Sequence, residues 1–360
     1  MPDPLTRSRL VTAVTAASCV TTLVAAVTTA AAAASRGGES VERIVVTEQA
    51  THQILVLDSD RRSWQKAKVL WRWRPSAANG LADLARGWGT PSEAKLRHHG
   101  RAAYLLTADS LGLAAVVPYP EGGQAYWATN VGPQPNVHSI ELLPDGNVAV
   151  IASRGGWLRI YTASQGERAN SYAEFPMPGG HGVFWDANTG LLWALGGTDL
   201  VALRIGGTPA APELTEVRRT PLPTPNGHDL QPVAARPERL WVATGGRVYQ
   251  YSKALDMFLR DYPGADEISA TGVKSVGDDR RSGQVLTALV QNRNLCTWCT
   301  DTVTLDHRGD DLTLHGAQIY KARWWVDPGA GSRPSSFAGR PTPPPWHPRD
   351  RMFPQVRVGP

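Results

Sequence analysis

Short runs of alternating apolar and polar residues, cut by Gly, Pro, Asn and Asp, make up most of the chain between residues 44 and 326. An alternation with a period of two residues is typical of β-strands that bury one face, and these turn residues end strands. One short helix is predicted at 79–88. Strands are predicted at 44–48, 53–58, 69–74, 102–108, 112–118, 125–130, 157–163, 172–176, 200–205, 214–221, 247–252 and 257–262.

Several of these segments repeat one another. His138, His181 and His228 each open a unit made of a short strand, a turn and a second apolar strand, and Lys274 and Lys321 open the next two units, 43 to 47 residues apart. A repeat of this length with several short strands is typical of a β-propeller. With a further unit that begins near residues 92–95, the pattern predicts an all-β protein with six blades, or seven if the ends are paired differently.

The two ends of the repeat region fit together. The strand at Tyr320–Val326 has no complete blade after it, and the strand that begins at Ile44 has no innermost strand before it. We expect the C-terminal strand to join the N-terminal blade, because this closes the ring and leaves no free sheet edge.

The termini differ from the repeats in composition. Residues 1–34 have a basic start, an uncharged apolar stretch and small residues at the end, which is the pattern of an export signal, and without cleavage this segment would be a membrane anchor. The propeller is predicted at 41–326. The Pro- and Arg-rich tail at 327–360 is expected to be disordered. We therefore expect a secreted monomer that meets a membrane only through an uncleaved signal.

Charge and motifs exclude some classes of protein. The net charge of +5 is spread along the chain without a block of five Lys or Arg, which argues against a nucleic-acid partner. Thirteen Trp against five Phe indicate either core packing or platforms for sugar rings. No nucleophile elbow and no phosphate-binding Gly loop is found, so the motifs assign no reaction.

Two cysteines, Cys296 and Cys299, remain outside the signal, in the sequence CTWC. A strand is predicted directly after them, whereas a redox CxxC motif is expected at the start of a helix. A zinc site needs a second pair of ligands at suitable spacing. We expect a local structural disulfide, since exported chains with paired cysteines usually oxidise them.

The repeated histidines are the first candidate site. Innermost propeller strands begin where the channel opens, so we expect His138, His181 and His228 to converge at one mouth. Three imidazoles are suitable ligands for a divalent metal such as Zn²⁺ or Mn²⁺. The alternative is that each ring makes hydrogen bonds to neighbouring blades and fills the mouth.

Three lysines add positive charge to the same place. If Lys274, Lys321 and Lys95 face the channel, the mouth favours a carboxylate, sulfate or phosphate group of a ligand, because clustered cations need compensation. The acidic residues expected near this rim, as partners that orient His or Lys, are Glu48, Glu93, Glu141, Asp229 and Glu267.

Some segments resemble known families. PDGNVAVIASRGGWLRIY (Pro144–Tyr161) resembles one repeat of the NHL and gluconolactonase-like six-bladed propellers. The set GWGTPSEAK, NVHSIELLPDGNVAV, GGHGVFWD, NGHDLQPV, CTWCTDTV and YKARWW resembles an uncharacterised family of exported bacterial propellers with a domain of unknown function. The resemblance implies a propeller and export, without an activity. Gluconolactonase-like enzymes hold calcium through Glu, Asn and Asp, and those ligands are absent from the matching strand starts, which argues against a lactonase.

Three functions remain open from the sequence. The first is binding of an acidic small molecule or an acidic sugar at the channel mouth through the three histidines and three lysines. The second is a metal-dependent lyase acting on an acidic polysaccharide, in which a metal on the histidines acidifies a C–H bond and a Lys or His removes the proton. The third is a non-catalytic scaffold that binds partners.

Overall fold

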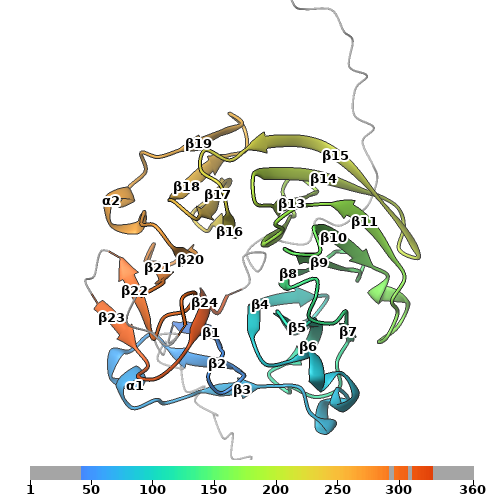
Figure 1. The fold of residues 1–360 in the computed structure, drawn as a ribbon, viewed down its shortest axis with the longest axis horizontal. Helices are drawn as coiled ribbons and strands as arrows, with labels where there is room; N and C mark the ends of the chain where they lie inside the picture. Colours follow the sequence, from blue (N-terminus) through green and yellow to red (C-terminus); the bar gives the residue numbers. More distant parts are fainter. Residues whose placement is uncertain (1–41, 292–295, 307–309, 327–360) are drawn as a thin grey trace, which may run out of the picture. The chain divides into compact units, whose positions relative to one another are not determined.

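The computed structural model describes residues 42–291, 296–306 and 310–326 of the chain. Within these ranges, six antiparallel sheets of four strands each surround a central channel (Figure 1). The prediction of an all-β, six-bladed propeller is confirmed, and the alternative of seven blades is excluded. The expected export signal at 1–34 and the expected tail at 327–360 lie outside the described residues, so these two assignments stay predictions.

The strands follow one another from the channel outward in five of the six blades. Blade 1 consists of β24 (Ile319–Trp324), β1 (Arg43–Glu48), β2 (Gln53–Asp58) and β3 (Trp71–Trp73); blade 2 of β4 (Pro91–His99), β5 (Ala102–Asp109), β6 (Leu113–Tyr119) and β7 (Trp127–Asn130); and blade 3 of β8 (Val137–Leu142), β9 (Val148–Ala152), β10 (Trp157–Tyr161) and β11 (Tyr172–Pro176).

The second half of the ring continues in the same order. Blade 4 consists of β12 (Gly182–Asp186), β13 (Leu191–Leu195), β14 (Asp199–Thr208) and β15 (Ala211–Pro221); blade 5 of β16 (Gly227–Val233), β17 (Arg236–Thr244), β18 (Val248–Ser252) and β19 (Met257–Leu259); and blade 6 of β20 (Val273–Asp278), β21 (Val285–Leu289), β22 (Thr302–Asp306) and β23 (Asp310–Thr313).

Helical structure is limited to short pieces between strands in the described ranges. The helix expected at 79–88 is two 3-10 turns, Ala77–Asn79 and Ala82–Gly87, separated by Gly80 in the left-handed conformation. Three further short pieces in the described residues are α1 (Arg61–Gln65), a 3-10 turn at Ala163–Gln165 and α2 (Ala265–Ile268). None of the helices in the described part of the chain is long and apolar enough to cross a membrane.

Local sequence explains how the strands turn. Between β8 and β9, Gly146 has φ +84°, a backbone conformation that L side chains rarely adopt, and the Asp145 carboxylate accepts a hydrogen bond from Asn147 N at 3.0 Å. An Asp side chain that binds backbone two residues on is a standard way to start a tight turn. The D-G-N sequence therefore joins two inner strands of blade 3.

The apolar core lies between neighbouring blades. Six clusters of buried side chains are present among the described residues, and each one joins two adjacent blades. Strand alternation produces this pattern, because each sheet is buried on both faces and successive side chains reach opposite neighbours. No blade has a complete core of its own, so the ring is stable only when it is closed.

Closure follows the prediction from the sequence. β24 pairs antiparallel with β1, with Ile44 opposite Trp324 and Val46 opposite Ala322, so the C-terminal strand is the innermost strand of the N-terminal blade. Trp324 is buried in the cluster that joins blades 1 and 6, and its Nε1 donates to the Gln284 carbonyl at 3.1 Å.

The two cysteines are joined as expected. Cys296 and Cys299 form a disulfide before β22, with their Cα atoms 5.7 Å apart. A local pair of this kind constrains the chain just before it enters the strand, and sulfur atoms joined in a disulfide are not available as zinc ligands.

Replacing Trp324 with Ala tests the closure. Loss of a buried Trp typically costs about 3–5 kcal/mol, so we expect the free energy of unfolding in urea to fall by about that amount. Leu255, which lies between β18 and β19 and is 67% exposed, provides the control, and Leu255→Ala is expected to change stability by less than about 1 kcal/mol. Equal effects of the two changes would contradict the closing role of β24.

Candidate binding site at the channel mouth

Five of the six innermost strands share one irregularity near the channel mouth, whereas β12, which His181 directly precedes, pairs in unbroken register. In β8, β16 and β20 the pairing register shifts by one residue near the strand start, which leaves His138, His228 and Lys274 as extra residues of a bulge. β4 has the same shift at Ser92. A bulge changes the direction of the side chain of the extra residue. Residues that repeat along the sequence therefore occupy equivalent positions at the start of successive innermost strands.

The bulge also corrects the alignment of the last unit. β24 places both Tyr320 and Lys321 opposite the single residue Thr47. The Tyr320 hydroxyl contacts His138, whereas Lys321 reaches the acidic side chains inside the channel. Tyr320 is therefore the spatial counterpart of His138, and Lys321 belongs to the next layer inward. From the repeat spacing, Lys321 was matched to the repeated histidines, and this match is wrong by one residue. The bulge shifts the strand by one position, and a shift of one residue exchanges the two faces of a strand.

Five side chains meet to form what we call the mouth layer: Tyr320, His138, His181, His228 and Lys274. The rings of His138 and His181 are stacked with centroids 4.1 Å apart. The rings of His181 and His228 meet edge to face at 5.3 Å. Lys274 Nζ donates to His228 Nε2 at 3.0 Å. The three histidines therefore converge, as expected from the sequence.

The hydrogen bonds of the rings fix where their protons lie. His181 Nδ1 is 2.7 Å from the Gly179 carbonyl, which only accepts, so Nδ1 carries the proton and Nε2 the lone pair. His228 Nε2 accepts from Lys274, which places its proton on Nδ1. In His138, Nε2 accepts from the Asn136 amide and Nδ1 donates to the Tyr320 oxygen. These contacts are consistent with three neutral imidazoles, of which only His138 has a partner at both nitrogens.

The surroundings keep the rings neutral. Burial lowers the pKa of His181 to about 4, an effect that the Gly179 carbonyl opposes and Lys321 increases. Burial and the neighbouring Lys274 lower the pKa of His228 to about 3. Burial, His181 and Lys321 also hold the pKa of His138 well below its ordinary value. At neutral pH the mouth layer therefore has three uncharged rings beside one lysine.

The open groups of the mouth layer are few. Among the described residues, nothing donates to His181 Nε2, and His228 Nδ1 is shielded from water without a hydrogen-bond partner. Lys274 is partly exposed, and its ammonium donates a hydrogen bond to His228. Burial and Lys321 lower the pKa of Lys274 to about 8. The layer thus offers one acceptor, one unpaired donor and an ammonium group.

This arrangement does not suit the metal centre suggested by the sequence. Both nitrogens of His138 already have partners, and His228 Nε2 binds an ammonium group that would repel a cation. Only His181 has an open lone pair in this layer. No group of three or more His, Cys, Asp or Glu in the described ranges is placed to hold a metal ion. A three-histidine metal site therefore stays a prediction without support from the geometry.

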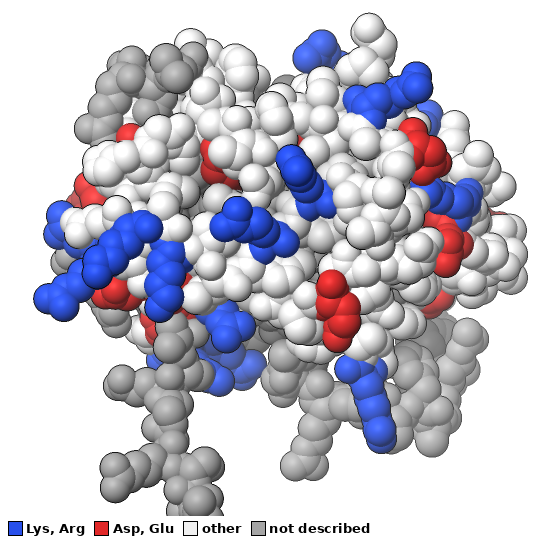
Figure 2. Space-filling view, turned by 90° about the horizontal axis from the view of Figure 1, so that it is seen from below, with Lys and Arg blue, Asp and Glu red and all other residues white. Residues whose placement is uncertain are grey.

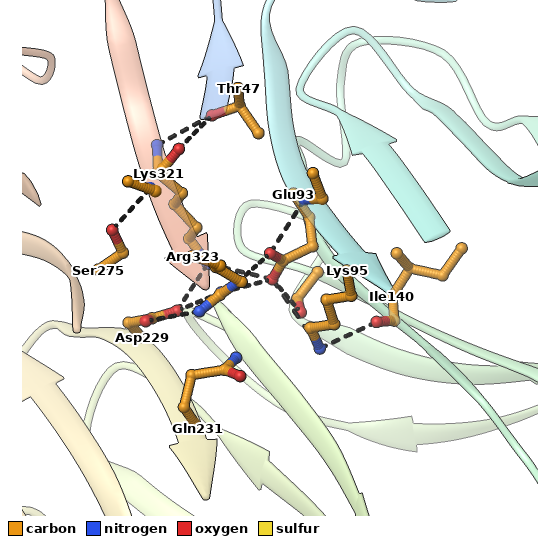
Figure 3. A network of polar contacts seen from close by, with 12 residues as sticks. Thr47, Glu93, Lys95, Ile140, Asp229, Gln231, Ser275, Lys321 and Arg323 are labelled. Carbon is orange, nitrogen blue, oxygen red and sulfur yellow. Dashed lines mark hydrogen bonds and ion pairs between the residues drawn. The ribbon is translucent and has the colours of Figure 1, made fainter. Parts of the chain in front are cut away.

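Below the mouth layer, charged side chains cross the channel in what we call the channel network (Figure 3). It comprises Glu93, Lys95 and Arg97 of β4, Glu141 of β8, Asp229 of β16, and Lys321 and Arg323 of β24. Strand alternation puts these residues on one face at every second position, starting just after each bulge.

Arg323 is at the centre of the channel network. Its guanidinium binds Glu93 through Nε at 2.7 Å and Nη2 at 2.9 Å, and it binds Asp229 through Nη1 at 3.0 Å and Nη2 at 2.6 Å. Two bidentate carboxylate contacts on one Arg satisfy the fork geometry of the side chain. Since Glu93, Asp229 and Arg323 come from blades 2, 5 and 1, this single side chain ties three blades together across the channel.

The two lysines of the network are fully engaged. Lys95 Nζ donates to the carbonyls of Ile140 and Val183 and contacts Glu141 at 3.4 Å. Lys321 Nζ contacts Asp229 at 3.2 Å and Glu93 at 3.4 Å. Both side chains are 1% exposed. Direct contact of Lys95 and Lys321 with a ligand, as the sequence suggested, has no support from these positions.

Sequence reasoning missed Tyr320, Arg97 and Arg323. The signal for the two arginines was present: charged residues recur at every second position in both the EAKLR segment at 93–97 and the KAR segment at 321–323. Charges on the face of an innermost strand point into the channel and need partners there. Glu93, Glu141 and Asp229 were expected as acidic partners near the channel mouth. In the structure, Glu141 binds Arg97, while Glu93 and Asp229 bind Arg323.

The charges do not balance among the described residues of the mouth and channel. Five cations, Lys95, Arg97, Lys274, Lys321 and Arg323, face three carboxylates, Glu93, Glu141 and Asp229. The outer face in Figure 2 differs, because Lys and Arg are scattered there among acidic and uncharged residues. The cations exceed the carboxylates by two. One of the two unmatched charges is that of Lys274, which is partly exposed and whose ammonium has a neutral ring rather than a carboxylate as its partner.

Two surface hollows lie away from this site. One of about 520 Å³ is lined by Tyr262 and by residues at the start of α2, and one of about 390 Å³ is lined by Trp71, Trp73 and neighbouring residues of blade 1. Neither hollow includes a residue of the mouth layer. The candidate site is therefore defined by converging side chains and unbalanced charge at the end of the channel.

Comparison with known proteins identifies a family and a fold. The model of a family described as "Family of unknown function (DUF6528)" matches residues 9–336. The resemblance to an uncharacterised propeller family is thereby confirmed. No protein with curated annotation matches the chain significantly.

The chain is also similar to solved structures. A protein of unknown function from Bacteroides caccae is 12% identical, with a TM-score of 0.50 over 79% of this chain and 98% of that chain. A candidate 6-phosphogluconolactonase from Bacteroides fragilis is 11% identical, with a TM-score of 0.45 over 80% and 99%. Virginiamycin B lyase from Staphylococcus aureus is 12% identical, with a TM-score of 0.40 over 62% and 68%. At these identities the likeness concerns the fold alone.

The channel network predicts acid sensitivity. Burial by itself would raise the pKa of Glu93, but Arg323, Lys321 and Lys95 outweigh it and hold that pKa far below its usual value near 4.5. A lowered carboxylate pKa stabilises the fold above the unfolded pKa, and this stabilisation is lost as pH falls. We expect the midpoint of urea unfolding to decrease steeply below about pH 4.5.

Variants separate this network from ordinary surface charge. Glu93→Gln is expected to cost about 3–5 kcal/mol at pH 7, because it leaves buried cations without a partner, and to make the decline below pH 4.5 shallower. Glu174→Gln is the matched control, since Glu174 pairs with Arg159 at 2.8 Å and its side chain is 44% exposed. It should cost less than about 1 kcal/mol. An unchanged acid profile in Glu93→Gln would contradict the assignment.

Proposed function

The chain belongs to the DUF6528 family, whose function is unknown, and from its channel mouth we propose that it binds an acidic small molecule or an acidic sugar unit there. The observation that carries this proposal is the excess of cations over carboxylates in the described part of the channel, with Lys274 at the accessible end. A confined cluster of like charges is costly, and an anion lowers that cost.

Lys274 is the principal binding group of the proposed site. Its ammonium has three protons and gives one to His228 Nε2, which leaves two for oxygen atoms of a ligand. The neutral rings of His181 and His228 reduce the access of water and so strengthen an ion pair at this position. Lys321 and Arg323 add positive potential from below, while their own contacts are with Asp229 and Glu93.

The two other functions have less support. A metal-dependent lyase needs several open lone pairs at the mouth, and the mouth layer offers one, at His181 Nε2. A scaffold with an inert channel would not need an exposed ammonium at the mouth, yet Lys274 is partly exposed and its hydrogen bond goes to a neutral ring. No observation on the molecule favours either function over anion binding.

Export is part of the proposed function. The disulfide between Cys296 and Cys299 is of a kind that forms and persists in oxidising compartments. Together with the signal-like composition of residues 1–34, it favours a secreted protein that meets its ligand outside the cell. A ligand of this class would be an acidic sugar or another small organic acid of the surroundings.

Calorimetric titration with glucuronate, galacturonate, a sulfated monosaccharide and inorganic phosphate tests the proposal. We expect at least one of these anions to bind the wild type, and we expect Lys274→Gln to weaken that binding at least about tenfold, because the variant lacks the unpaired charge. High salt should weaken binding by the wild type.

The matched control is Lys68→Gln, which removes an exposed lysine outside the channel and should leave the affinity unchanged. Near-ultraviolet circular dichroism of both variants checks that the aromatic packing is intact. Wild-type protein that binds none of these anions, or a Lys274→Gln variant that binds as well as the wild type, would refute the proposed site.

A further inference from the structure

The mouth layer contains a hydrogen-bond acceptor beside its cation, and that pairing narrows the class of ligand. Because His181 Nδ1 donates to the Gly179 carbonyl at 2.7 Å, the ring presents the lone pair of Nε2. No donor in the described ranges bonds to that lone pair. His181 is also partly exposed, whereas the stacked ring of His138 is buried. His181 Nε2 is thus an acceptor available to a ligand O–H or N–H group.

The orientation of the His228 ring leaves His181 as the acceptor and Lys274 as the cation of the mouth layer. His228 Nε2 accepts from Lys274 Nζ at 3.0 Å, so this ring positions the ammonium and cannot accept from a ligand at Nε2. Its Nδ1 proton remains unpaired. The rings of His181 and His228 are in edge-to-face contact with centroids 5.3 Å apart, and Lys274 Nζ lies 3.0 Å from His228 Nε2, so the acceptor and the cation belong to one cluster of side chains.

We propose that the mouth layer recognises 2-hydroxy acids, with the ligand carboxylate on Lys274 and the adjacent hydroxyl donating to His181 Nε2. This inference rests on the proposed function and specifies its ligand. An acid without a hydroxyl group satisfies Lys274 but leaves the His181 lone pair without a donor once water is displaced. A polar site rejects a ligand that lacks the matching group, because a buried partner is then left unpaired.

The chemistry distinguishes this class from other anions. A carboxylate or a sulfate ester presents only acceptors at neutral pH and cannot donate to His181 Nε2, whereas a hydroxyl group next to the carboxylate supplies one donor at a short fixed distance. Sugar acids of the aldonate type have this pair of groups at one end. The inference therefore favours a free hydroxy acid over a simple inorganic anion.

Three acids of the same chain length provide the test: hexanoate, 2-hydroxyhexanoate and 2-methoxyhexanoate. The methoxy compound keeps the oxygen but has no proton to donate. We expect the wild-type protein to bind 2-hydroxyhexanoate about threefold to tenfold more tightly than the two other acids, the range that one hydrogen bond gives. This comparison needs no variant, so a folding defect cannot obscure it.

Two variants then assign the preference to a residue. His181→Phe keeps a flat ring without the lone pair, and we expect it to bind all three acids with equal affinity. Lys274→Gln should weaken all three acids by a similar factor and keep the hydroxyl preference, because the two contacts are separate. Thermal unfolding of each variant checks that the propeller remains folded.

The outcomes separate this inference from the proposed function. Equal affinity of the wild type for the three acids, or a preference that persists in His181→Phe, overturns the hydroxy-acid assignment and leaves anion binding in place. Absence of binding for all three acids, together with binding of inorganic phosphate, also overturns the assignment and retains an anion site. Absence of binding for every anion refutes both.

Discussion

The clamp of Arg323 between Glu93 and Asp229 is the interaction on which the rest of this channel depends. It joins the last strand of the described fold to blades 2 and 5, and all three side chains are buried. A buried ion pair is costly to desolvate, and it is tolerated here because each carboxylate oxygen has partners and the guanidinium is bidentate on both sides. The clamp also makes the ring closure specific, since β24 in another register would leave three charges unpaired.

The same strands serve two purposes within a few residues. The bulge near the start of β8, β16 and β20 sends one side chain to the mouth and the next into the channel. The residues directly after the bulges, Ser139, Asp229 and Ser275, take part in the polar contacts inside the channel. The mouth positions hold neutral rings and the ammonium of Lys274, which lacks a carboxylate partner in the described region. The paired charges of the channel network and the ammonium of Lys274 at the mouth therefore lie in adjacent layers of the channel.

This separation explains why the mouth suits an anion better than a metal. Metal centres require several lone pairs aimed at one point. Here hydrogen bonds to Asn136, Tyr320 and Lys274 already use the lone pairs or protons of two rings. The remaining groups are a cation and one acceptor, His181 Nε2, which together match an acid with a neighbouring hydroxyl group. In the proposed complex, the histidines would act as neutral hydrogen-bonding rings that position the lysine and the ligand.

Much of the fold could be read from local pattern. Alternation, turn residues and the repeat of His138, His181 and His228 were sufficient for the strands, the six blades and the closure by the C-terminal strand, because the periodicity of a strand and the length of a blade are properties of the chain itself. The site was only partly predictable. The sequence indicated that three histidines would converge, but it assigned Lys321 to the mouth in place of Tyr320.

What the sequence by itself determined about this protein is the architecture and the end of the channel where histidine and lysine gather. The tertiary structure alone decided which charges are available. A one-residue bulge exchanges the two faces of a strand, and pairing between distant strands decides whether a lysine meets a carboxylate, as Lys95 and Lys321 do, or a neutral ring, as Lys274 does. Those partners lie on other blades, and no local pattern specifies them.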